Sequence, residues 1–154
     1  MKRLSHRLLA GLALVTTVAV ATPTTVSAQD ASPEAAYRQS IMQGFRLHMG
    51  AIRAVLSGAA PAGHVEHHAV AFQALATTLA NAFPEGSHGP GSRALPAIWE
   101  NRTDFMNKVS AIQSATADLV SAARSGDGDR VSAAMSAVQG TCGSCHQPYR
   151  GPAR

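Results

Sequence analysis

The sequence is poor in two features, large aromatic residues and strand-like patterns. Its 154 residues include only four Phe, two Tyr and one Trp. A core built mainly from alanine with so few rings would be thin on its own, because buried apolar area drives folding. No segment alternates apolar and polar residues in the manner of a β-strand, so the chain is expected to be all-α.

The sequence also lacks an apolar run at its N-terminus long enough to span a membrane. Residues 8–21 carry no charge, but they are fewer than the roughly 20 that a spanning helix needs. Lys2, Arg3 and Arg7 precede or border this run, and small residues ending at Ala28 follow it. This arrangement is typical of a secretory signal peptide. We expect cleavage after Ala28, export to the periplasm without stable membrane insertion, and one domain over residues 29–154; an uncleaved anchor is the alternative.

A strong net charge is absent once that segment is set aside. Three of the 13 Lys and Arg residues lie within residues 1–28, and none of the nine Asp and Glu residues do, which leaves a formal charge of +1. A nucleic-acid-binding protein usually has a clustered basic face. We therefore expect no nucleic acid partner.

What the sequence does contain is a pair of cysteines beside a histidine, in the run Cys142-Gly143-Ser144-Cys145-His146. C-x-x-C-H is the attachment signature of c-type haem. Each thiol would add across one vinyl group of the porphyrin, and a two-residue gap on a helix spans the separation of those vinyls. The pattern predicts one covalently attached haem c, with His146 as an axial ligand of the iron.

Two other interpretations of the cysteines are weaker. A redox-active dithiol belongs near a strand–helix unit, and this chain shows no strand pattern. A zinc site would need two more ligands within tetrahedral reach. A helical bundle closed by a disulfide is a third interpretation, but it leaves the histidine beside the motif unexplained.

Hydrophobic periodicity predicts four helices after residue 28. The first begins at Pro33 after a Ser32 N-cap and is closed by Gly58. The others are expected at about residues 64–82, 100–124 and 129–150, with a loop over residues 84–96 and a turn over residues 125–128. The residues expected to face the core are Met42, Phe45, Met49, Ile52, Leu56, Phe72, Leu75, Leu79, Phe83, Phe105, Val109, Ile112, Leu119, Ala123, Val131, Met135, Val138, Cys142, Cys145 and Tyr149, with Thr116 as a polar step.

These stripes have the spacing of helix bundles, and the short connections make neighbouring helices antiparallel. We therefore predict a four-helix up-down-up-down bundle. Its haem would stand near the end where the first helix starts and the fourth finishes. An inserted haem would also enlarge the core, because it buries several hundred Å² of apolar surface. That burial contributes on the order of 10 kcal/mol of gross stabilisation.

The same topology identifies a candidate for the second face of the haem. His146 lies ~6 Å before the end of the fourth helix, and Met42 lies ~14 Å into the first. Met42 can therefore approach the face opposite His146. Met49 is ~10 Å deeper on the same stripe, and His48 is almost as deep but off the stripe. A methionine at such a position is more often core filler.

The residues resemble those of class II c-type cytochromes, meaning cytochrome c′ and its low-spin relatives. The resemblance extends over essentially the whole chain after residue 28. It rests on Tyr37-Arg38-Gln39-Ser40, on Pro96-Ala97-Ile98-Trp99, and on residues 142–146 followed by Tyr149-Arg150. Attachment of haem near the C-terminus is particular to this class.

The resemblance implies a role for three further residues. In cytochrome c′ proper, the position of Met42 is commonly leucine, which leaves the iron five-coordinate and open to nitric oxide or carbon monoxide. In the low-spin relatives that position is a methionine ligand, so Met42 is expected to be the sixth ligand. Arg38 is expected to meet a haem propionate, and Arg150 to pack near His146. Either arginine could instead be a solvated surface charge.

Three histidines are not explained by haem binding. His64, His67 and His68 share one face of the second predicted helix, with Glu66 among them. They could hold a second metal ion such as copper or zinc. We expect instead a solvated polar face, and His88 would support a metal site only if its loop folded back.

The predicted function follows from the predicted ligands. An imidazole and a thioether on one iron leave no open position for a substrate, so we expect a periplasmic one-electron carrier and not an enzyme. The alternative is a five-coordinate haem protein that binds nitric oxide or carbon monoxide. Redox proteins are the expected partners, and the resemblance allows a homodimer through the first two helices. The sequence does not identify the electron donor, the acceptor or the reduction potential.

Overall fold

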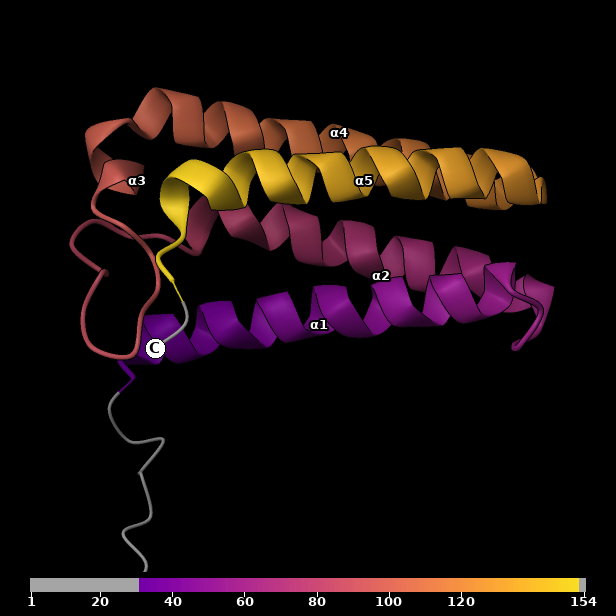
Figure 1. Ribbon diagram of the computed structural model, residues 1–154, viewed down its shortest axis with the longest axis horizontal. Coiled ribbons are helices and arrows are strands. Elements are labelled where there is room, and N and C mark those ends of the chain that lie inside the picture. The colour runs from indigo at the N-terminus through magenta and orange to yellow at the C-terminus, as the bar shows by residue number, and fades with distance from the viewer. Residues whose placement is uncertain (1–30, 153–154) are drawn as a thin grey trace, which may run out of the picture.

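The computed structural model describes residues 31–152, and the predicted signal peptide of residues 1–28 lies outside them. The described residues form four long helices and one short one, which are labelled in Figure 1. They are α1 (Pro33–Leu56), α2 (Val65–Thr78), α3 (Ala97–Glu100), α4 (Arg102–Arg124) and α5 (Gly128–Tyr149), with 3₁₀ turns at Ala62–His64 and Leu79–Asn81. This part of the chain has no β-strand, and none of its helices is long and apolar enough to cross a membrane.

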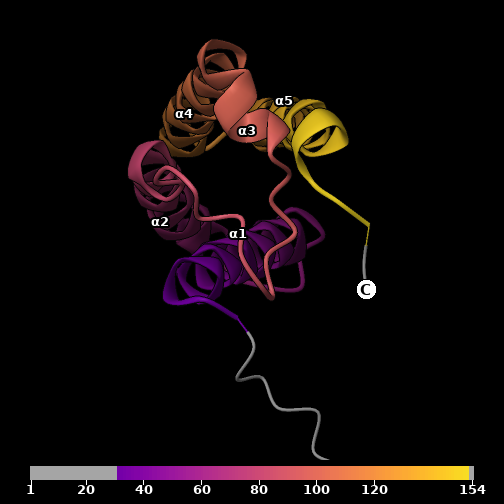
Figure 2. The same cartoon turned by 90° about the vertical axis from the view of Figure 1, so that its left-hand side faces the viewer.

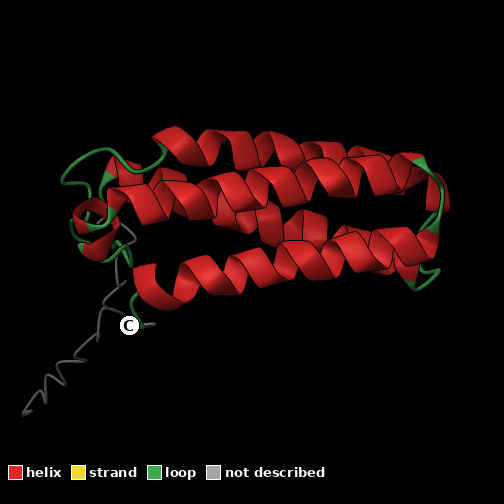
Figure 3. Ribbon diagram, turned by 90° about the horizontal axis from the view of Figure 1, so that it is seen from above, coloured by secondary structure: helices red, strands yellow, loops and turns green. Residues whose placement is uncertain are grey.

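The long helices run up, down, up and down, which confirms the predicted four-helix bundle (Figure 1). The end-on view in Figure 2 places α1 beside α2, α2 beside α4, and α4 beside α5. Helix α1 therefore starts at the end of the bundle where α5 finishes. Figure 3 shows that a long loop covers this end, whereas short turns join the helices at the other. We call the first of these ends the loop end and the second the turn end.

Helix α1 begins where the sequence predicts. The Ser32 hydroxyl accepts a hydrogen bond from the Ala35 amide at 3.2 Å, and Pro33 occupies the first helical position. Gly58 follows the last turn with a φ of 77°, a conformation that glycine adopts without strain.

The core face of α1 differs slightly from the predicted stripe. Ile41, Phe45 and Ile52 are buried, and Met42 and Met49 pack along the edge of the core. The prediction that Leu56 faces the core was wrong, because its side chain is 37% exposed. It is the last residue of the helix, where the chain turns away from the bundle.

Two helix boundaries also differ from the sequence prediction. The second helix leaves the α conformation after Thr78 and tightens into the 3₁₀ turn before Pro84, although Leu79 and Phe83 are still buried. The third predicted helix is divided at Asn101, whose φ of −116° and ψ of 48° are not helical. Apolar spacing continues through both places, so periodicity alone does not reveal these breaks.

Helices α4 and α5 bury their predicted stripes. Phe105, Val109, Ile112, Leu119, Ala123, Val131, Met135, Val138 and Tyr149 are all buried. Thr116 is fully buried among them, and its hydroxyl donates to the carbonyls of Ile112 and Gln113, each at 2.9 Å. Its polar group is therefore satisfied within its own helix.

Helices α1 and α5 make few contacts with each other, unlike the other neighbouring pairs. At the loop end they are connected through residues 84–96, which cross this end from α2 past α1 to α3 (Figure 2). Leu95 donates its amide to the Tyr149 carbonyl at 3.1 Å, and Gly151 donates to the Arg93 carbonyl at 2.8 Å. The Arg93 guanidinium donates in return to the Gly151 carbonyl at 2.6 and 2.9 Å. The loop is thus bonded to the chain that leaves α5.

Arg38 bonds the same loop to α1. Its side chain is only 6% exposed. The guanidinium donates to the Ala82 carbonyl at 3.1 Å, to the hydroxyl and carbonyl of Ser87 at 2.8 and 2.5 Å, and to the Ser92 hydroxyl at 3.2 Å. It also lies 5.0 Å from the centre of the Phe83 ring. Burial lowers the pKa of Arg38, but a guanidinium remains charged at any physiological pH.

Replacing Arg38 with alanine is expected to lower the free energy of unfolding by about 2–3 kcal/mol, because charge-assisted hydrogen bonds are lost and buried acceptors are left without a donor. Arg46 is exposed on the same helix and provides the control. Arg46→Ala should change stability by less than about 0.5 kcal/mol. Chemical denaturation of both variants measures the difference, and equal effects would show that the loop does not depend on Arg38.

Candidate functional site

The two cysteines of the C-x-x-C-H motif lie in the last turns of α5, three residues apart and therefore on one face. Both side chains are partly buried and packed against the core, and no disulfide joins them. Burial raises the pKa of the Cys142 and Cys145 thiols. The motif therefore presents two sulfur atoms on one face of α5, beside apolar side chains.

His146 follows them on α5 and is half-buried. Burial lowers the pKa of its imidazole, and the positive charges of Arg150 and Arg93 lower it further. The neutral ring has a free nitrogen lone pair, the form in which histidine binds a metal. Burial and the two arginines therefore favour the neutral form of His146.

Tyr149 anchors this end of α5 to α4. Its side chain is 5% exposed, and its ring meets Phe105 edge-on at a centroid distance of 5.4 Å. Its hydroxyl donates to Asp104 Oδ2 at 2.6 Å. Burial and this carboxylate raise the pKa of Tyr149 to about 12. The partnership with Asp104 has no signal in the sequence, because it joins residues 45 positions apart.

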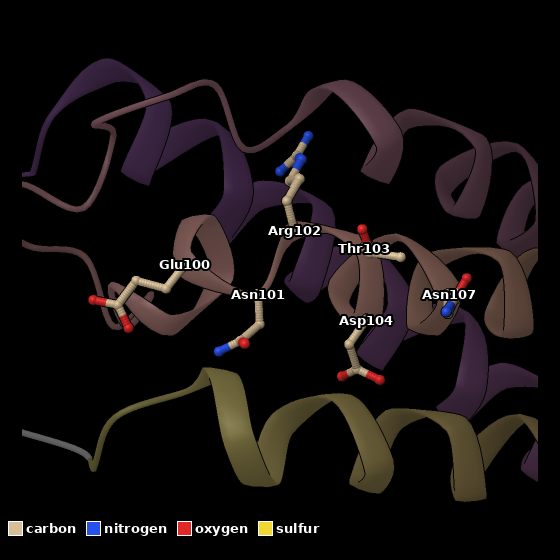
Figure 4. Close-up of a pocket in the computed structure, with 6 residues that line it drawn as sticks. All are labelled: Glu100, Asn101, Arg102, Thr103, Asp104 and Asn107. Carbon is tan, nitrogen blue, oxygen red and sulfur yellow. The ribbon is translucent and has the colours of Figure 1, made fainter.

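Figure 4 shows a pocket at the junction of α3 and α4 with Asp104 on its α5 side. Its lining residues are Glu100, Asn101, Arg102, Thr103, Asp104 and Asn107. None of them was predicted to bind haem or iron. The residues predicted to attach haem and ligate its iron on α5, namely Cys142, Cys145 and His146, do not line this pocket.

Met42 is the tenth of the 24 residues of α1, and His146 lies in the last turn of α5, so both belong to the half of the bundle at the loop end. Its side chain is partly buried against the core. Helices α1 and α5 make little direct contact, yet each contributes sulfur-containing side chains at the edge of the core. On α1 these side chains are Met42 and Met49, and on α5 they are Cys142 and Cys145.

The two arginines have different surroundings. Arg38 is buried, so its interpretation as a solvated charge was wrong. Among residues 31–152 the ion pairs are Lys108–Asp104 and Arg124–Glu66, and Arg38 therefore has only neutral hydrogen-bond partners there. Its two terminal nitrogen atoms make two hydrogen bonds each. Arg150 is exposed, and its backbone amide donates to the His146 carbonyl at 3.1 Å.

The three histidines of the second predicted helix do not gather into one site. His64 and His67 are exposed, and the described residues contain no group of three or more His, Cys, Asp or Glu side chains placed to hold a metal ion. His68 instead meets His48 of α1, with the two Nδ1 atoms 3.2 Å apart. His88 packs against Trp99 with a centroid distance of 5.3 Å; its loop is at the loop end, far from His64.

Comparison with known proteins identifies the family. The family described as Cytochrome C′ matches residues 34–150. A cytochrome c-556 of Agrobacterium tumefaciens (strain II Chrys) is 38% identical over 120 residues, which cover 73% of this chain and 93% of that protein. A cytochrome c′ of Pararhodospirillum photometricum is 36% identical over 126 residues, covering 78% of this chain and 99% of that protein.

A solved structure agrees with this assignment. It is a variant of cytochrome c prime from Alcaligenes xylosoxidans in complex with nitric oxide, with a TM-score of 0.71 and 31% sequence identity. The match covers 77% of this chain and 94% of that one. The chain therefore belongs to the cytochrome c′ family and is a class II c-type cytochrome with one covalently attached haem c.

Proposed function

We propose that this protein is a periplasmic one-electron carrier whose haem iron is low-spin and ligated by His146 and Met42. The observation that supports the proposal most directly is the thioether of Met42. It lies at the edge of the core on α1, in the half of the bundle where α5 ends with His146. A histidine–methionine pair raises the reduction potential of haem iron relative to two nitrogen ligands.

Cys142 and Cys145 would hold the haem through thioether bonds, and His146 would be the proximal ligand. The bound haem supplies a one-electron change at iron. The protein's own residues would fix both ligands and keep water from them. Tyr149, held by Asp104, fixes the turn of α5 that carries His146. Arg38 would face a propionate, and Arg150 would lie near His146.

Ligation of the iron by Met42 is also the reason that we propose an electron carrier and not an enzyme. With His146 on one face and Met42 on the other, the iron would have no open position for a substrate. Electron transfer needs no such position, since it requires only that the haem approach the surface of a redox partner. The function is therefore transfer of an electron between two other proteins.

A second candidate function is the binding of a diatomic gas. It is favoured by the similarity to proteins named cytochrome c′ and to a solved cytochrome c prime that contains nitric oxide. In that case the iron would be five-coordinate and Met42 would be only a core side chain. The two functions differ in whether the thioether is bound.

The surface of α1 and α2 is compatible with a homodimer. Tyr37 and Leu47 on α1 are 51% and 69% exposed, and Val70 on α2 is 42% exposed. Contact with a second copy would remove this apolar surface from water. We propose that a second copy covers them.

Export is the step that would bring the chain to the periplasm. The basic residues and the short apolar run within residues 1–28 are expected to act as a cleaved signal. N-terminal sequencing of the protein from a periplasmic extract should begin at Gln29. A membrane-bound protein that keeps Met1 would contradict cleavage and support the anchor.

Attachment of haem is expected to need both thiols. The exported protein should keep its haem through acid–acetone extraction, whereas Cys142→Ser or Cys145→Ser should weaken or abolish retention. Ser144→Ala is the matched control, because Ser144 is exposed between them and donates only to the Thr141 carbonyl. Release of haem from the unmutated protein would disprove covalent attachment.

Substitution of Met42 distinguishes the two candidate functions. Met42→Leu removes the sulfur donor and nearly conserves volume, so the fold should lose less than ~1.5 kcal/mol. The ferric iron should change from low-spin to high-spin, the weak sulfur-to-iron charge-transfer band at long wavelength should disappear, and the reduced protein should bind carbon monoxide readily. Optical spectra and carbon monoxide titration measure these changes.

Met49→Leu is the control, because Met49 is a partly buried methionine on the same helix, about 10 Å further along. It should leave the spectrum unchanged. If the unmutated protein is already high-spin and Met42→Leu does not alter it, the gas-binding function replaces electron transfer.

A further inference from the structure

A pair of histidines joins α1 to α2 away from the residues expected to hold haem. His48 of α1 and His68 of α2 place their Nδ1 atoms 3.2 Å apart. The ring centroids are 5.4 Å apart and the planes are inclined by 49°. Both side chains are half-buried, so the pair is positioned by the packing of two helices and is still accessible to small ions.

The spacing of the two nitrogen atoms matches that of two ligands on one metal ion. Zinc binds imidazole nitrogen at about 2.0–2.1 Å in a tetrahedron, so two of its ligands lie about 3.3 Å apart. Without a metal, the Nδ1–H group of one ring donates a hydrogen bond to the Nδ1 atom of the other. For both Nδ1 atoms to bind a metal ion, the donor ring would move its proton from Nδ1 to Nε2. The pair would then release no proton to solvent.

The charge state of His48 also suits a cation. Burial lowers the pKa of His48, and the neighbouring His68 lowers it further. At neutral pH the His48 ring is therefore uncharged, and it does not repel an approaching ion. Glu66, the nearest acidic residue in sequence to His68, is already paired with Arg124 at 2.9 Å.

We propose that His48 and His68 form a two-imidazole binding site for a divalent late transition-metal ion, with Cu²⁺ bound most tightly. Imidazole suits copper, zinc and nickel, and Cu²⁺ has the highest affinity in this series. Because no third protein ligand gathers there among residues 31–152, water would fill the remaining positions. Calcium and magnesium, which need oxygen ligands, are not expected to bind.

The two histidines are separate from the proposed iron ligands, because His48 is six residues beyond Met42, or about 9 Å along α1. The proposed metal site therefore does not depend on the spin state of the haem. It would also exist if the protein bound gases instead of carrying electrons.

The test is a calorimetric titration of the ferric holoprotein with CuCl₂, in a buffer with glycine as a weak competitor for single surface histidines. We expect one copper ion per chain. Affinity should fall at least tenfold in His48→Ala and in His68→Ala. It should be unchanged in His64→Ala and His67→Ala, which remove exposed histidines from the same region. MgCl₂ should give no heat of binding.

A spectroscopic measurement on the unmutated protein covers the case in which a variant fails to fold. Frozen-solution electron paramagnetic resonance of the copper-loaded ferric protein, labelled with ¹⁵N-histidine, should show coupling to two imidazole nitrogens. The proposal is overturned by the absence of a stoichiometric site, by equal affinity in all four variants, by loss of binding in His64→Ala or His67→Ala, or by coupling to a single imidazole.

Discussion

The loop end of the bundle depends on the buried guanidinium of Arg38. Helices α1 and α5 make few direct contacts, so residues 84–96 have to keep them in register at this end. Arg38 bonds the loop to α1 through Ser87 and Ser92, while Arg93 and Leu95 bond it to the chain beyond α5. A charge buried without a carboxylate partner is costly, and its several hydrogen bonds offset that cost.

The helix pairs with the most extensive packing are not the pair that is predicted to hold the haem. The pairs α1–α2, α2–α4 and α4–α5 make the most extensive contacts between helices, whereas α1 and α5 touch only slightly. The residues predicted to hold the haem and its iron belong to these last two helices: Met42 lies on α1, and Cys142, Cys145 and His146 lie on α5. A haem bound between α1 and α5 would supply the apolar contacts that these helices do not make with each other. The cofactor would then stabilise the fold as well as carry the function.

Local signals in the sequence predicted those features whose cause is local. Ser32 before Pro33 marks the start of α1, and the apolar stripe of α4 marks its buried face. The features that were missed need distant partners. The family resemblance singled out Arg38, but hydrophobic periodicity does not show that it is buried and Arg46 exposed, because the acceptors of Arg38 lie 44 to 54 residues further along the chain. His48 was noted only as off the stripe, since its contact with His68 appears when α1 and α2 pack.

The unequal ends of the bundle have a practical consequence for handling the protein. The turn end consists of short connections around Gly58 and Gly126, where an added side chain would meet no neighbouring atom within 4 Å. About 27 Å of helix separates Gly128 from His146. An affinity peptide or an electrode linker inserted at this end would leave the C-x-x-C-H end pointing outward. A fusion placed directly after α5, by contrast, would crowd the end of the bundle that carries the C-x-x-C-H motif.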